Sequence, residues 1–142
     1  MGFMQIPRKV DYAIRAAIYL AAQDPAKNCS TGKIAESQGI PRKFLEKIIQ
    51  NLTRSGLVKS KRGSDGGYSL ARPTHEISLR DIIEAVEGPI SLNVLMDERC
   101  TRLGVWTEVQ RKLVDTFACT TLADAKLTLP RALSSASLSS TA

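Results

Sequence analysis

The chain has 142 residues, of which 43% are hydrophobic, and this length suits one folded domain with an appendage. Its formal net charge is +6, and no apolar run approaches the roughly 20 residues that a membrane-spanning helix needs. The three cysteines are too few and too scattered for a disulfide framework, so we expect free thiols and a cytoplasmic protein. The single histidine, and the lack of a phosphate-binding loop or zinc-protease motif, argue against an enzyme.

The positive charge is concentrated in the first half of the chain. Residues 1–68 carry 12 Lys and Arg against 5 Asp and Glu, whereas residues 69–142 carry 8 against 9. A localised positive field suits a polyanionic partner, and a merely soluble basic protein would not need such segregation. We therefore expect the N-terminal half to contact a polyanion, of which double-stranded DNA is one.

The first predicted helix covers residues 8–23, where apolar residues recur at helical spacing. Arg8 and Lys9 lie at its start, where the helix dipole disfavours positive charge. Contact with DNA phosphates would offset that cost, and two solvated charges are the alternative. A loop then leads to a short second helix over roughly residues 31–38.

Residues 41–54 form a third predicted helix with two opposite faces. Its apolar face comprises Leu45, Ile48, Ile49 and Leu52. Its basic and polar face comprises Arg42, Lys43, Lys47, Gln50 and Arg54. Pro41 suits the first helical turn and Gly56 suits the C-terminus. With the second helix and the glycine-containing turn before it, this segment predicts a helix-turn-helix unit.

Residues 57–70 have the pattern of a β-hairpin. Short extended stretches at 57–60 and 68–70 flank a basic, glycine-rich tip. A helix fits the major groove of DNA, and Arg62 at the hairpin tip can reach a phosphate or enter the minor groove. The alternative is an ordinary amphipathic helix with a solvated hairpin. The order of helix, strand, basic loop and strand favours a recognition helix followed by a wing.

A fourth helix is predicted over residues 80–86, with Ser78 as its N-cap, whereas residues 90–104 have no clear pattern. A long helix over residues 105–118 follows, and residues 119–124 are expected to add a further helical turn. The apolar stripe of the long helix comprises Val105, Trp106, Val109, Leu113 and Phe117. A second copy of the chain is the expected partner of this stripe, and packing on its own domain is the alternative.

These elements predict a mainly α-helical fold with a small β-hairpin wing. We expect a winged helix-turn-helix domain over residues 1–90, followed by a linker and a dimerisation helix over residues 91–127. Residues 128–142 are small and polar and are expected to form a flexible tail.

Four segments together resemble one family of bacterial regulators. They are KVDYAIRAAIYLA, KIAESQGIPRKFLEKIIQNLTRSGLVKSKRGSDGGYSLAR, ISLRDIIEAVEGP and TTLADA. In order and spacing they resemble the winged-helix regulators that include IscR, NsrR and CymR. The resemblance implies a homodimeric transcription factor, usually a repressor, that binds a palindromic operator.

The same resemblance assigns residues to the DNA contact. The recognition helix presents Arg42, Lys43, Phe44 and Lys47, and the wing presents Arg62, Gly63 and Ser64. Glu46 matches an acidic position that discriminates between operators in IscR, and a solvated charge or a pair with a neighbouring lysine is the alternative. Core packing is the alternative for Phe44.

The chain departs from the family at the sensor. Cluster-binding members carry three cysteines, each separated by five residues, and only Cys100 occupies such a place here. Val94 and Gly88 stand at the other two places, and neither can bind iron. We therefore expect no cofactor, with a 2Fe–2S cluster held through Cys100 and non-standard ligands as the alternative. Such ligands would come from Cys29, His75, Cys119 or acidic residues near the N-terminus of the partner chain.

Three hypotheses about function follow. The first is a cluster-free DNA-binding regulator with an unknown effector, which a regulatory partner protein could supply as it does for CymR-like members. The second is a redox-sensing regulator that uses the Cys100 thiol. The third is a winged-helix protein-interaction module whose basic face meets an acidic protein, and the salt dependence of DNA binding separates it from the others.

Overall fold

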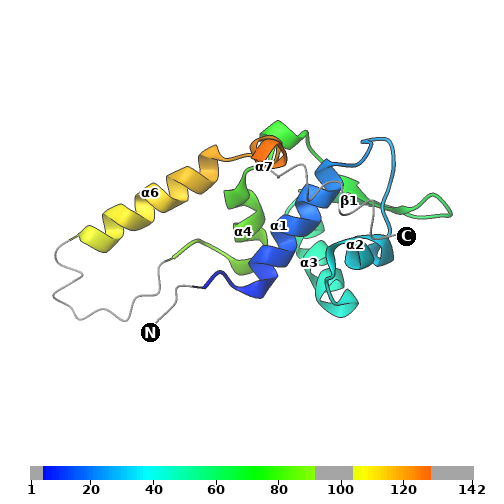
Figure 1. The fold of residues 1–142 in the computed structure, drawn as a ribbon, viewed down its shortest axis with the longest axis horizontal. Helices are drawn as coiled ribbons and strands as arrows, with labels where there is room; N and C mark the ends of the chain where they lie inside the picture. The colour runs from blue at the N-terminus through cyan, green and yellow to red at the C-terminus, as the bar shows by residue number, and fades with distance from the viewer. Residues whose placement is uncertain (1–4, 92–103, 129–142) are drawn as a thin grey trace.

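The structure is a computed structural model that describes residues 5–91 and 104–128, and this part is mainly helical with one antiparallel hairpin. Its elements are α1 Arg8–Ala21, α2 Thr31–Gln38, α3 Arg42–Arg54, β1 Val58–Lys61, β2 Gly67–Leu70, η1 Thr74–Glu76, α4 Leu79–Glu87, α6 Val105–Cys119 and α7 Leu122–Thr128. In Figure 1, α1 crosses the middle of the body, the hairpin projects at one end and α6 extends from the other. The predicted fold class is confirmed. No helix within the described ranges is long and apolar enough to cross a membrane.

Helix α1 lies at the centre because its inward face is made of small residues. Ala13, Ala16 and Ala17 are buried, and they let α3 and α4 pack closely against this face. The facing side of α3 is the predicted apolar stripe, and Leu45 and Leu52 are fully buried in it. Burying a leucine contributes about 1.5–3 kcal/mol, so this contact between α1 and α3 is a main source of stability.

Helix α2 is fixed at both of its ends, and the second of these is the turn that leads into α3. The Ser30 hydroxyl caps α2 by accepting a hydrogen bond from the Lys33 amide at 3.2 Å. Gly39 ends α2 with φ of 62°, a left-handed conformation that glycine adopts without strain. The Arg15 guanidinium of α1 donates to the carbonyl oxygen of Gln38, so α1 also holds the end of α2. Helix α3 therefore starts from a rigid turn.

The wing is anchored to the loop before α2. Strands β1 and β2 pair from Val58↔Leu70 to Lys61↔Gly67. On the other edge of β2, Tyr68 and Cys29 exchange two backbone hydrogen bonds of 2.8 Å each. A Cβ atom at Gly67 would lie 2.6 Å from the Cys29 carbonyl oxygen, so only glycine fits this close approach. The base of the wing is thus a fixed part of the domain.

Helix α4 begins with the predicted cap. The Ser78 hydroxyl accepts from the Asp81 amide at 3.1 Å, and the Asp81 carboxylate accepts from the Ser78 amide at 3.0 Å. This reciprocal pair is a capping box, and it satisfies two amides that the helix cannot satisfy itself. Ile82, Ile83 and Val86 then face the core.

The chain after α6 differs from the prediction. The long helix gains only Cys119, because Thr120 is extended and a separate helix, α7, begins at Leu122. Backbone hydrogen bonds join Leu79 to Thr120 at 2.8 Å and Leu122 to Ile77 at 2.9 Å. The Leu122 side chain is fully buried. Helix α7 thus packs on α1 and η1, and it adds Leu122 to the same core as the winged-helix residues.

Helix α6 itself contributes little to that core. None of its residues is buried, and Val105, Trp106 and Val109 are 53%, 37% and 43% exposed. Phe117, which the sequence placed on the same stripe, is partly buried against the core instead. Leu113 lies between these extremes, as a partly exposed side chain. The helix is therefore attached at its C-terminal end and free along most of its apolar stripe.

Candidate nucleic-acid interface

The outer face of α3 carries the candidate recognition residues. Burial of Leu45, Ile48 and Ile49 on one side turns the other side of the helix to solvent. The residues exposed there include Arg42, Lys43, Phe44, Glu46, Lys47 and Gln50. The structure therefore brings the four residues predicted on this helix together on one accessible face.

Phe44 is the most unusual member of this face. Its side chain is 60% exposed, although the next residue, Leu45, is fully buried. Core packing was the alternative for Phe44, and the structure excludes it. An exposed aromatic side chain on a basic helix can make apolar contact with a thymine methyl group in the major groove.

The charges on α3 remain available to a partner. Arg42 and Glu46 form an ion pair of 3.3 Å, but both side chains are mostly exposed, so the pair contributes at most about 1 kcal/mol. Lys43 and Lys47 make no ion pair within the described part of the chain. Glu46 pairs with Arg42 rather than with either lysine, and it can compete with DNA for that arginine.

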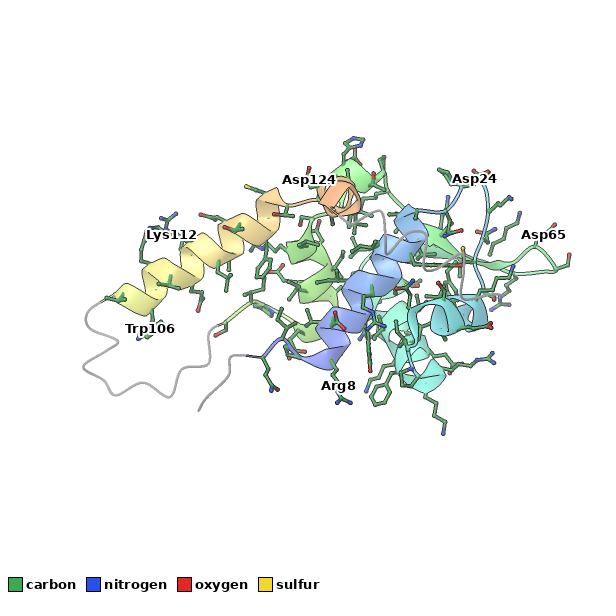
Figure 2. All side chains as sticks on the ribbon, viewed as in Figure 1. Arg8, Asp24, Asp65, Trp106, Lys112 and Asp124 are labelled. Carbon is green, nitrogen blue, oxygen red and sulfur yellow. The ribbon has the colours of Figure 1, made fainter. Side chains whose placement is uncertain are left out.

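The wing tip presents the three predicted residues to solvent. Arg62, Gly63 and Ser64 are all exposed. The tip is held as a tight turn by a hydrogen bond of 3.0 Å from the Gly66 amide to the Gly63 carbonyl. The Asn28 side chain also donates to the Asp65 carbonyl at 3.1 Å, which ties the tip to the loop before α2. Figure 2 shows Asp65 at the far end of this hairpin.

A hollow between α2, α3 and the wing joins these surfaces. Its volume is about 740 Å³, and its lining includes Thr31, Arg42, Lys61, Arg62 and Tyr68. The N-terminus of α2 opens into it, with amide groups that favour anions. Sequence reasoning missed the contribution of Thr31, because only the tertiary fold brings the start of α2 beside the wing. A phosphate group is the ligand that this combination suits.

The two charges at the start of α1 differ in their surroundings. Arg8 is exposed, and in Figure 2 it points outward at the lower edge of the molecule. The Lys9 ammonium lies 2.5 Å from a carboxylate oxygen of Glu87 at the end of α4. DNA contact by Lys9 remains a prediction, and it requires exchange of this exposed ion pair for a phosphate.

The candidate sensor residues are not assembled into a site in the described ranges. Cys100 lies outside the described residues, and Gly88 caps α4. Cys29 is buried beside the wing, where burial raises the pKa of its thiol, whereas Cys119 is exposed at the end of α6. His75 is exposed in η1. Within residues 5–91 and 104–128, no three His, Cys, Asp or Glu side chains gather as metal ligands, so the donors described do not fit a cluster.

A helix-turn-helix with an exposed basic face, followed by a hairpin with a basic tip, defines a winged-helix transcriptional regulator. The sequence matches the Rrf2 family, described as iron-dependent transcriptional regulators, over residues 6–126. The chain belongs to this family, as its resemblance to IscR and CymR predicted.

Individual relatives agree with this assignment. The chain is 34% identical to the regulator CymR of Bacillus subtilis, over 85% of this chain and 88% of CymR. It is 42% identical to an HTH-type transcriptional regulator of Mycobacterium tuberculosis, over 62% of this chain but only 55% of that relative's length. The solved structure of B. subtilis CymR matches with a TM-score of 0.79 and 31% identity, over 90% of this chain and all (100%) of CymR. The structure of T. potens IscR matches with a TM-score of 0.76 and 32% identity, over 91% and 90% of the two chains.

Adjacent residues on α3 should separate folding from surface function. Leu45→Ala leaves a cavity in the core and should lower the free energy of unfolding by about 2–5 kcal/mol. Phe44→Ala removes an exposed ring and should change it by no more than about 0.5 kcal/mol. Urea denaturation followed by circular dichroism measures both values. Equal destabilisation by the two substitutions would contradict the assignment of Phe44 to the outer face.

Proposed function

We propose that this protein is a sequence-specific DNA-binding repressor that acts as a homodimer on a palindromic operator. The observation that supports this most directly is the shared surface of the recognition helix, the wing and the start of α2. On it, Arg42, Lys61 and Arg62 surround a hollow of about 740 Å³. Cations and helix amides in this arrangement suit the DNA backbone.

Each part of this surface has a role in the proposal. The N-terminal half of α3 enters the major groove, where Lys43 and Lys47 reach base edges or phosphates and Phe44 meets apolar base groups. The hollow receives a phosphate of one strand, which sets the register of the protein on the duplex. Arg62 at the wing tip contacts the backbone or the adjacent minor groove. Arg8 extends the same positive field.

The dimer rests on the exposed stripe of α6. Val105, Trp106 and Val109 are large apolar residues that remain 37–53% exposed in the single chain. A contiguous apolar stripe of this kind marks an interaction surface. A second copy of the chain supplies a matching stripe, and two-fold symmetry then places two recognition helices on the halves of a palindrome.

The sensor in this proposal contains no cluster of the three-cysteine type. Val94 and Gly88 replace two thiolates, and the described donors do not gather as ligands. A redox-active Cys100 thiol and a regulatory partner protein are the remaining routes for a signal. The family's description as iron-dependent favours the competing proposal, in which Cys100 acts with ligands from unusual positions.

Loss of the wing arginine should weaken binding to every duplex. Arg62→Ala removes one phosphate contact, so the slope of log affinity against log salt should fall by about one unit. Fluorescence anisotropy with a labelled duplex at several salt concentrations measures both quantities. Arg80→Ala on α4, where Arg80 pairs with Glu84 at 3.0 Å, is the matched control and should bind as the parent does. Unchanged affinity and slope in Arg62→Ala would remove the wing from the interface, and no salt dependence at all would favour a protein-interaction module.

The α6 stripe should control assembly. Leu113→Asp places a charge in the proposed interface without a partner, which is strongly unfavourable for a dimer. Sedimentation velocity should show dimers for the parent and monomers for this variant. Lys112→Asp puts the same charge one residue away on an exposed position and should leave the dimer intact. A parent that sediments as a monomer at micromolar concentration would end the dimer proposal.

Iron content tests the sensor. Protein purified without oxygen should be colourless and hold much less than one iron per chain, because one thiolate in a ligand position supplies little of a cluster's affinity. Iron analysis and visible spectroscopy measure this directly. A brown protein with about two irons per chain, lost in Cys100→Ala, would establish the cluster-binding alternative.

A further inference from the structure

A second hollow lies behind the wing, at the C-terminal end of α1. Its volume is about 530 Å³, within the range of small-molecule sites. The end of α1, the loop that follows it, strands β1 and β2 and the turn after β2 line it. Figure 2 shows Asp24, one of its lining residues, at the upper edge of the molecule, whereas Arg8 is at the lower edge. The recognition helix does not line this hollow.

The lining is positively charged. Lys27, Lys59 and Arg72 contribute three cations, and none of them makes an ion pair within the described part of the chain. Asp24 is the acidic residue of the lining, and its carboxylate accepts a hydrogen bond from the Ala26 amide at 2.9 Å. The hollow therefore attracts an anion.

Ser69 supplies an independent indication of a ligand. The residue is 7% exposed, and its hydroxyl has no hydrogen-bond partner among the residues that the structure describes. A buried polar group without a partner is costly and rare in folded proteins. Ser69 lies on β2 directly opposite Lys59 on β1, and both line the hollow. A ligand oxygen that reaches this hydroxyl can accept its hydrogen bond, with the flexible Lys59 side chain turned toward the same anion.

The rest of the lining is apolar and suits the body of an organic molecule. Leu20, Ala21, Leu70 and Pro73 contribute to it. We propose that this hollow binds a small organic anion, with its oxyanion held by Lys59, Arg72 and the Ser69 hydroxyl and its apolar body against Leu20 and Leu70. Carboxylates and phosphate monoesters share this chemistry.

Occupancy of this site has a direct route to the wing. Lys59 and Ser69 belong to the two strands that carry the wing tip, and both also line a smaller hollow beside Lys61. A bound anion neutralises charge at the base of the wing and fixes these strands. Ligand binding itself does not depend on the proposed function, whereas its effect on DNA affinity rests on it.

The test uses the full chain without DNA. Phenyl phosphate and benzoate are titrated separately while backbone amide shifts are followed by NMR, with inorganic phosphate and phenol as the two half-ligands. At least one organic anion should bind saturably, with a dissociation constant of about 1 mM or below. The largest shifts should lie at Ser69, Leu70 and Arg72. The two anions distinguish a carboxylate site from a phosphate site.

Matched variants locate the site. Ser69→Ala and Arg72→Gln should each weaken binding by about tenfold, because each removes a hydrogen bond to a charged group. Arg80→Gln removes a cation elsewhere and should bind as the parent does. Ser69→Ala should retain full thermal stability, since it removes an unpaired buried hydroxyl. No saturable binding, or shifts centred on Thr31 and Arg62 instead, would overturn the proposal.

Repeating the DNA titration with saturating anion then separates the two proposals. If the protein binds the anion but no duplex, the anion site stands and the proposed function is wrong. If it binds duplex in a salt-dependent way but no organic anion, the proposed function stands and the anion site is wrong.

Discussion

The burial of one face of α3 against the alanine face of α1 is the contact on which the rest of the structure depends. Small side chains at Ala13, Ala16 and Ala17 bring the two helices close together, and the leucines and isoleucines of α3 fill the space between them. Because the apolar side of α3 faces the core, its basic side must face solvent. Arg15 holds the end of α2 on the same helix, so the approach of α3 to a DNA groove is set by α1.

The wing follows from a second constraint, which is a backbone contact rather than side-chain packing. The pairing of Cys29 with Tyr68 joins the hairpin to the loop before α2, and Gly67 is required for that approach. The start of α2 and the base of the wing therefore form one rigid unit, and the hollow between them is built by the fold. The tip around Arg62 projects from this unit and is tied back to it by the hydrogen bond from Asn28 to the Asp65 carbonyl.

Much of this arrangement could be predicted because its signals are local. The 3.6-residue periodicity located α1 and α3, and Ser78 is the N-cap expected for α4, although the helix begins at Leu79, one residue before the predicted start. Helix α7 was not predicted as a separate element, because its position depends on hydrogen bonds between segments more than 40 residues apart in sequence, such as Leu122 to Ile77. The role of the α2 N-terminus, the ion pair of Lys9 with Glu87 and the orphan hydroxyl of Ser69 were also beyond local signals. Each depends on residues that only tertiary contacts bring together.

The stability of helix α6 gives a second, energetic reason to expect the predicted dimer interface. Its ion pairs, such as Arg111 with Glu108 at 2.6 Å, are exposed, and such pairs add little stability. A helix of 15 residues is marginal in water without tertiary contacts, and only the region of Phe117 reaches the core. In the proposed dimer, packing of Trp106 and Val109 on a second copy supplies the missing contacts. The folding of α6 and the relative placement of the two recognition helices then depend on the same buried surface. A signal that weakens this dimer contact would therefore also change the spacing of the two DNA-binding domains.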